Sequence, residues 1–103
     1  MPRSAGDLAP HEYVVRGQWP TGRLVKDAPA SAVYGQQFVL RLTEALKAKG
    51  EPSLHAVERE AQVSRRTVER TLKGEVLPDF GAIARLEEWL GTDLWPGPEV
   101  RSA

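Results

Sequence analysis

Residues 53–74 read SLHAVEREAQVSRRTVERTLKG, and this stretch decides the fold. It predicts two short helices separated by a break at Gln62-Val63. Ser53 and Ser64 stand where each helix would begin, and a serine hydroxyl at that position accepts a hydrogen bond from a backbone amide of the first turn. Gly74 stands where the second helix would end. We therefore expect one helix from Ser53 to about residue 61 and a second from Ser64 to residue 73.

The second of these helices carries its charges on one side. With ~100° of rotation per residue, its five charged residues fall within an arc of about 140°, and Val68 and Leu72 fall opposite, with Thr71 beside them. The charged residues are Arg65, Arg66, Glu69, Arg70 and Lys73. Any amphipathic surface helix has a solvated face, but three arginines favour a ligand with phosphates or guanine edges, which a guanidinium binds through two hydrogen bonds.

Two short helices joined by a tight break have the layout of a helix-turn-helix. The stretch from Ser53 to Gly74, together with Leu77-Pro78-Asp79 and the segment from Ile83 to Trp95, resembles the phage-repressor/Cro-like helix-turn-helix family. The most specific part is Val-Ser-x-x-Thr-Val-x-Arg over residues 63–70, followed by glycine and proline. The resemblance covers residues 36–95 and implies a domain that places the second helix in the major groove of double-stranded DNA.

The resemblance also implies which side chains meet DNA. Base edges would be read from Arg65, Arg66, Glu69 and Arg70, with the glutamate accepting from a cytosine amino group. Backbone phosphates would be contacted by Ser64, Thr67, Lys73, Arg41 and Lys47.

Three residues depart from the family's pattern. Gln62 stands where the turn usually holds glycine, and a left-handed glutamine costs ~1 kcal/mol. Glu58 replaces a small residue that packs between the two helices, and Leu54 replaces a glutamine that touches phosphate.

The rest of the chain divides into an arm, a helical body and a tail. The pattern turns helical from Ser31 onward, and residues 31–95 are expected to form the helix-turn-helix domain. An apolar stripe marks a further helix over residues 38–49, and another is expected from about residue 79 to Gly91. Prolines and glycines interrupt residues 1–30, which read as a loose N-terminal arm, and residues 96–103 as a tail. The predicted fold is all-α, a compact bundle of four to five short helices behind the irregular arm.

The arm contains one candidate β-hairpin. Residues 13–15 and 24–25 have strand character, and Trp19-Pro20-Thr21-Gly22 reads as the turn between them. Because an isolated hairpin is marginal in water, this one must lie on the helical body or on a partner.

Composition excludes several classes of protein. The 103 residues allow one small domain, and the chain has no cysteine and only two histidines, His11 and His55, so we expect no disulfide, metal or other cofactor. No apolar run could span a membrane, and Asp7 and Glu12 interrupt any secretory signal, so we expect a cytoplasmic protein. No catalytic motif is present, so we expect no enzyme. Net charge is zero, but residues 64–74 hold four cations and one acid.

These observations favour a sequence-specific DNA-binding transcriptional regulator, with repression preferred, that acts as a homodimer. The dimer surface would lie either on Tyr13–Val25 or on Trp89–Trp95, since both carry aromatic residues. Two alternatives stay open. One is an antitoxin-like or anti-repressor partner whose arm binds another protein, and the other is a degenerate helix-turn-helix used only for protein contact.

Overall fold

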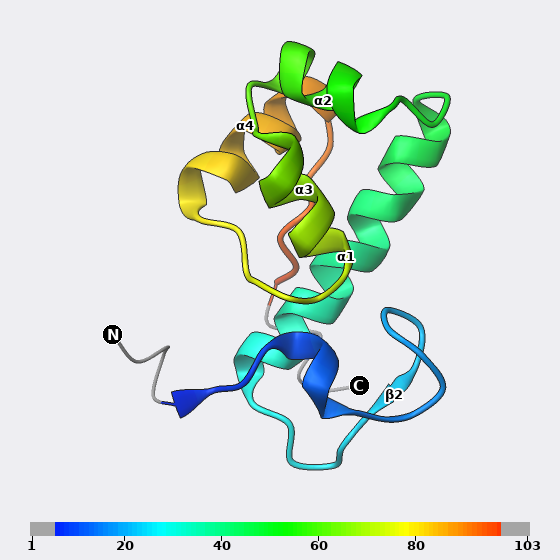
Figure 1. Ribbon diagram of the computed structural model, residues 1–103, viewed down its shortest axis with the longest axis vertical. Helices are drawn as coiled ribbons and strands as arrows, with labels where there is room; N and C mark the ends of the chain where they lie inside the picture. The colour runs from blue at the N-terminus through cyan, green and yellow to red at the C-terminus, as the bar shows by residue number, and fades with distance from the viewer. Residues whose placement is uncertain (1–5, 98–103) are drawn as a thin grey trace.

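The computed structural model describes residues 6–97, and within them four α-helices dominate the fold (Figure 1). Their bounds are α1 Ala30–Ala48, α2 Leu54–Ala61, α3 Arg65–Leu72 and α4 Phe80–Leu90. They are preceded by a 3-10 helix and two strands, which are η2 Pro10–Tyr13, β1 Val14–Arg16 and β2 Arg23–Leu24. The predicted helical fold with a small N-terminal hairpin is confirmed. Of the predicted tail, only Pro96 and Gly97 lie within the described residues.

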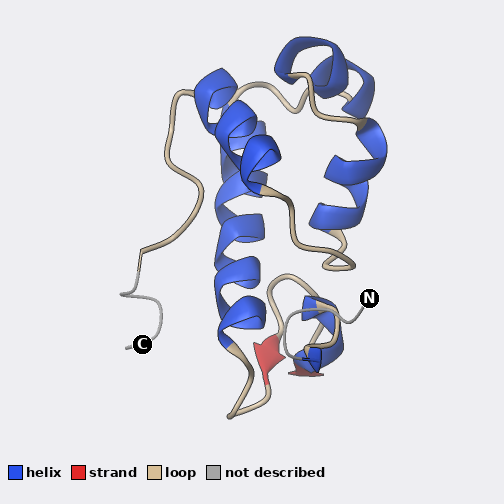
Figure 2. Cartoon of the chain, turned by 90° about the vertical axis from the view of Figure 1, so that its left-hand side faces the viewer, coloured by secondary structure: helices blue, strands red, loops and turns tan. Residues whose placement is uncertain are grey.

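Helix α1 runs along the length of the molecule, and the other elements gather at its two ends (Figures 1 and 2). Helices α2, α3 and α4 pack around its C-terminal half, whereas η2 and the hairpin lie beside its N-terminal end. The core joins all four helices to the segment that follows α4. Its largest fully buried side chains include Phe38, Leu42, Val57, Val68, Leu86 and Leu94.

Helix α1 is longer than the sequence predicted. The helical pattern expected from Ser31 onward is confirmed, since α1 begins at Ala30, but α1 is a single helix of 19 residues, so the expectation of short helices throughout was wrong. Its first turns bury Ala32 and Gly35, and a Cβ on Gly35 would approach the Leu77 side chain to 2.9 Å. Close packing in the first turns of α1 needs small residues. Small residues form no stripe of large apolar side chains, so hydrophobic periodicity does not reveal this part of the helix.

The boundaries of the other three helices agree with the sequence prediction because local hydrogen bonds set them. Each helix is capped by a side chain that accepts a hydrogen bond from the backbone amide three residues later. The Ser53 and Ser64 hydroxyls do so at 3.1 Å for α2 and α3, and the Asp79 carboxylate does so at 2.7 Å for α4. Gly91 ends α4 in the left-handed conformation at φ 70°.

The hairpin also follows the prediction, with a small shift in its turn. Val14 pairs with Leu24 in antiparallel register. The Gly22 amide donates to the Gln18 carbonyl oxygen at 2.6 Å, so the turn starts at Gln18, one residue before the expected Trp19, and ends at Gly22 as expected. No helix among residues 6–97 is long and apolar enough to cross a membrane.

Candidate nucleic-acid interface

The connection between α2 and α3 is three residues long, and its geometry depends on Gln62. This residue has φ 64° and ψ 36°, the left-handed conformation in which glycine is usual. Its amide donates to the Glu58 carbonyl oxygen at 3.1 Å, and the next residue, Val63, is buried in the core. The chain therefore turns sharply out of α2 and enters α3 at Ser64 without a glycine.

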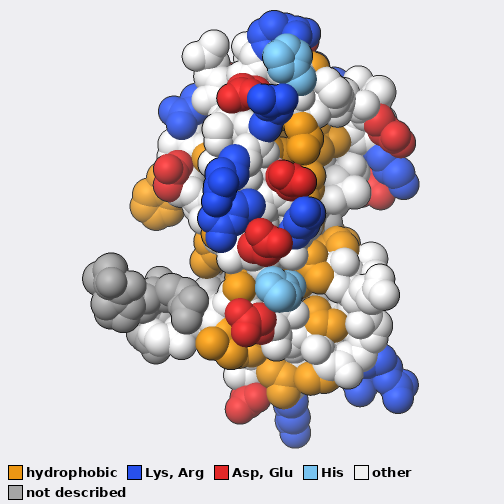
Figure 3. Space-filling view, viewed as in Figure 1, with side chains coloured by type: hydrophobic (Ala, Val, Ile, Leu, Met, Phe, Trp, Pro, Cys, Tyr) orange, Lys and Arg blue, Asp and Glu red, His pale blue; other side chains and the backbone are white. Residues whose placement is uncertain are grey.

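Helix α3 has one buried side and one charged side, as its sequence predicted. Val68 and Thr71 are 1% and 2% exposed, and Leu72 is half-buried against the core. The charged side lies on the face viewed in Figures 1 and 3, where Lys and Arg side chains gather with acidic side chains between them. The helix thus presents a mixed charged strip to solvent.

Three of the four α3 cations have acidic partners. The pairs are Arg65–Glu58 at 3.0 Å, Arg70–Glu75 at 3.3 Å and Lys73–Glu69 at 3.3 Å. Two of these carboxylates come from outside α3, which a count of charges along residues 64–74 misses. Arg66 differs from the other three cations, since it is exposed and makes no ion pair with any residue between 6 and 97.

The N-terminal end of α3 is held by local hydrogen bonds. The Ser64 hydroxyl accepts from the Thr67 amide at 3.1 Å and donates to the Thr67 hydroxyl at 2.9 Å. Ser64 therefore caps the helix, and it does so from an exposed position beside Arg66. Ser64 is exposed and Thr67 is half-buried, and both stand in the first turn of α3 with Arg66.

Glu58 and Leu54, the other two residues that depart from the family's pattern, lie in different surroundings. Glu58 does not pack between the helices, because its side chain is 43% exposed and reaches Arg65 at the start of α3. Leu54 is half-buried against the core, so it contributes apolar packing where a phosphate contact would be expected.

The structure does not gather all the expected phosphate contacts around α3. Arg41 lines a cleft with residues 90 and 92–94, none of which belongs to α3. The chain after α4 lies on the opposite side of α1 from α3 (Figure 2). Lys47 is exposed in the last turn of α1, where the chain leads toward α2.

Sequence reasoning missed how the arm holds the C-terminal end of α3. The Trp19 indole donates from Nε1 to the Leu72 carbonyl oxygen at 3.0 Å, and the His11 amide donates to the Gly74 carbonyl oxygen at 3.0 Å. Gly74 has φ 73°, and a Cβ there would lie 2.5–2.8 Å from the Trp19 ring. The arm is therefore packed on the body, not loose. The only available signal was a tryptophan next to a proline-glycine turn.

The arm is also tied to α1. The Gln36 side-chain amide donates to the carbonyl oxygens of Pro20 and Gly22 at 2.9 and 2.7 Å. The turn of the hairpin is thus fixed between α1 and the end of α3, which orients α3 relative to α1.

The remaining candidate residues form no reactive cluster. His55 is exposed, and no group of three potential metal ligands occurs among residues 6–97. Trp89 donates to Glu60 at 3.2 Å and lies under the Lys49 ammonium, 5.0 Å from the ring centre. Trp95 packs its ring near Tyr34 and Phe38. Both tryptophans at this candidate dimer surface therefore have intramolecular partners.

Known proteins offer no guide to this site. Comparison with family models, curated proteins and solved structures finds no significant match to the chain. A functional assignment therefore rests on the residues and their geometry.

Proposed function

We propose that α2 and α3 form a helix-turn-helix of the phage-repressor/Cro-like type, and that the protein binds double-stranded DNA with α3 in the major groove. The observation that carries this proposal is Arg66, an exposed cation in the first turn of α3 that has no ion-pair partner within the described part of the chain, residues 6–97. It stands beside the cap at Ser64, on a short helix whose opposite side is buried. A helix of this type presents its N-terminal residues to base edges.

The other cations contribute once DNA displaces their partners. Arg65, Arg70 and Lys73 are paired with carboxylates that are about half exposed. Exposed ion pairs contribute only ~0.2–1 kcal/mol, so duplex phosphates or guanine edges can replace the carboxylates at small cost. Glu69, released from Lys73, can accept from a cytosine amino group.

The hydroxyls at the start of α3 fit a phosphate contact. Ser64 and Thr67 satisfy each other through hydrogen bonds, and both lie at the exposed N-terminal end of the helix. Their role is to position the domain on the DNA backbone while Arg66 reads sequence.

The biological role that follows is transcriptional regulation, with repression favoured. One α3 makes few base contacts, which is insufficient to find one site in a genome. We therefore infer that two copies bind a two-fold site together.

Selection from a random duplex library with the full-length protein would supply the binding site. Affinities of variants for that site and for an unrelated duplex would then be measured by fluorescence anisotropy across a salt series. Arg66→Ala should weaken binding to the selected site by about 1–3 kcal/mol, with the loss confined to particular base pairs. Lys73→Ala is the matched control, and should weaken both duplexes alike and lower the salt slope by about one unit.

An Arg66→Ala variant that loses affinity equally on both duplexes would show that Arg66 does not read bases. One observation favours a second function, a helix-turn-helix used only for protein contact. Carboxylates pair with three of the four cations on the charged side, which weakens attraction to phosphates. Absence of duplex binding by the folded protein at low salt would overturn the first candidate and leave the second.

A further inference from the structure

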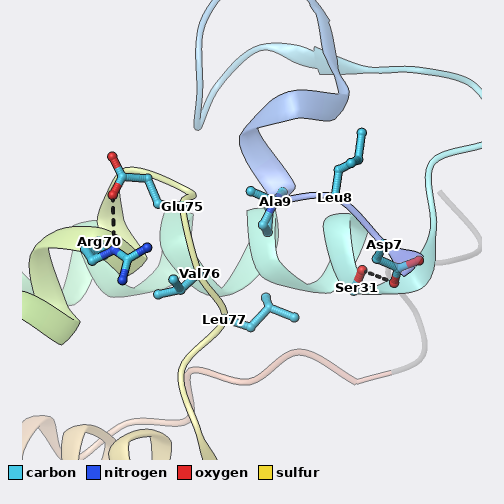
Figure 4. A pocket seen from close by; sticks show the side chains of 9 residues that line it. Asp7, Leu8, Ala9, Ser31, Arg70, Glu75, Val76 and Leu77 are labelled. Carbon is cyan, nitrogen blue, oxygen red and sulfur yellow. Dashed lines mark hydrogen bonds and ion pairs between the residues drawn. The ribbon is translucent and has the colours of Figure 1, made fainter. Parts of the chain in front are cut away.

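The ion pair between Arg70 and Glu75 is made at one particular nitrogen of the guanidinium. The Arg70 Nε donates to Glu75 Oε1 at 3.3 Å, and the two terminal nitrogens of Arg70 point away from that carboxylate (Figure 4). Asp7, the other acid at the cleft in Figure 4, accepts from the Ser31 hydroxyl at 2.6 Å. Glu75 therefore holds the inner nitrogen of Arg70 and leaves the terminal edge of the guanidinium to another ligand.

The backbone fixes where the Glu75 carboxylate stands. The Glu75 amide donates to the Arg70 carbonyl oxygen at 2.9 Å, and the Gly74 amide donates to the Thr71 carbonyl oxygen at 3.0 Å. With Gly74 at φ 73°, these two bonds form a Schellman ending, which folds the chain back against the last turn of α3. Arg70 and Glu75 are thus joined twice, once by backbone and once by side chains. Because the backbone bond does not use the Glu75 side chain, a substitution there removes the carboxylate and keeps the end of α3.

A second arginine of α3 has a carboxylate at the same atom. Arg65 approaches Glu58 through Nε, 3.0 Å from Oε1, and Glu58 comes from α2 instead of the loop after α3. Lys73 also pairs with an acid, but an ammonium has no second edge of fixed geometry to offer to a base. Pairing at Nε therefore affects what an arginine can bind in a way that pairing at a lysine does not.

We propose that Glu75 is a positioning residue for base recognition, which holds Arg70 at Nε so that its two terminal nitrogens bind the O6 and N7 atoms of one guanine. This inference rests on the proposed function and refines it, because a guanine can bind Arg70 in this way without displacing the carboxylate. Without Glu75, the Arg70 side chain is free to turn to any nearby phosphate, which raises affinity without regard to sequence. Glu75 thus favours the guanine contact over the phosphate contact.

The test measures base preference in the full-length protein. Binding of Arg70→Ala to a panel of single-base-pair changes in the selected site identifies the guanine, as the position where preference is lost. Glu75→Ala should reduce preference for that same guanine about tenfold, and should bind an unrelated duplex more tightly with a salt slope steeper by ~0.9 unit. Its melting temperature should stay nearly unchanged, because the pair is about half exposed.

Two further variants separate positioning from charge. Glu75→Gln keeps an oxygen that can accept from the Arg70 Nε, so it should retain most of the guanine preference although it also binds the unrelated duplex more tightly. Glu88→Ala is the matched control, since it removes the same charge from an exposed position on α4 and should leave the guanine preference unchanged.

A measurement on the free protein needs no DNA. By NMR, the Arg70 Nε proton should exchange with solvent more slowly than the Arg66 Nε proton, and the difference should disappear in Glu75→Ala. Equal exchange in the unaltered protein would overturn the positioning role. So would an unchanged guanine preference in Glu75→Ala, which would show that the carboxylate only competes with DNA. A protected Arg70 proton in a protein that binds no duplex would overturn the proposed function, and with it the role of Glu75 in base recognition.

Discussion

The two ends of α3 are held in different ways, although the helix is only eight residues long. At the N-terminal end, Ser64 and Thr67 form hydrogen bonds within one turn, and Arg66 has no acidic partner among residues 6–97. At the C-terminal end, Trp19 and His11 reach the last carbonyl groups from more than fifty residues away in the chain.

One end of α3 is therefore available to a ligand, and the other end anchors the helix to the rest of the molecule. The exposed end has hydrogen bonds that need no other part of the molecule, so its side chains are available to a ligand. The other end is covered by the arm, and α3 is thereby oriented on α1. A helix anchored at one end and open at the other can present side chains to a partner in a defined direction.

Trp19→Ala should have the largest effect on this arrangement. It removes an indole packed against the core and its hydrogen bond to the Leu72 carbonyl oxygen, and we expect a loss of about 3 kcal/mol in the free energy of unfolding. Urea denaturation measures this loss. Val15→Ala, on the exposed side of the hairpin, should change stability by less than about 0.5 kcal/mol. A similarly small effect of Trp19→Ala would mean that the arm does not anchor α3.

Gly74→Ala should come next, with a loss of about 2 kcal/mol. An alanine at position 74 would have to keep the left-handed backbone conformation of Gly74, which costs ~1 kcal/mol, and its Cβ would collide with the Trp19 ring. In the Trp19→Ala background the collision disappears, so the loss should fall to about 1 kcal/mol. A double-mutant cycle measures the difference, and strict additivity of the two substitutions would argue against direct contact.

Ser64→Ala should have the smallest effect of the three. It removes one N-cap hydrogen bond at an exposed position, and we expect a loss of about 1 kcal/mol. Ser64→Asp is the conservative comparison and should retain most of the stability, because aspartate also caps helices well. Should Ser64→Ala cost as much as Trp19→Ala, the contrast between the two ends of α3 would be wrong.

Much of the helical framework could be predicted because it depends on neighbours in the chain. The caps at Ser53 and Ser64, and the ends of α3 and α4 at or beside Gly74 and Gly91, are local features. The apolar side of α3 also follows from spacing alone, with Val68 buried as expected. The full length of α1 escaped prediction, because its first turns have no stripe of large apolar side chains and their small residues pack against segments distant in sequence.

The candidate site could be predicted in its composition but not in its charge balance. The sequence identified the arginines of α3, yet Glu58 and Glu75 reach Arg65 and Arg70 from neighbouring segments. Which cation remains unpaired depends on where those segments fold back, and spacing along one helix does not contain that information.

The bounds of α2, α3 and α4 and the side of α3 that faces outward could be read from the amino-acid sequence alone, since both follow from hydrogen bonds and periodicity within a few residues. The folded structure was needed to show that the arm lies on the end of α3 through Trp19, and that Arg66 alone among the α3 cations has no acidic partner within residues 6–97. The physical reason is that these features are contacts between segments far apart in the chain, whose partners are fixed only when the whole core closes.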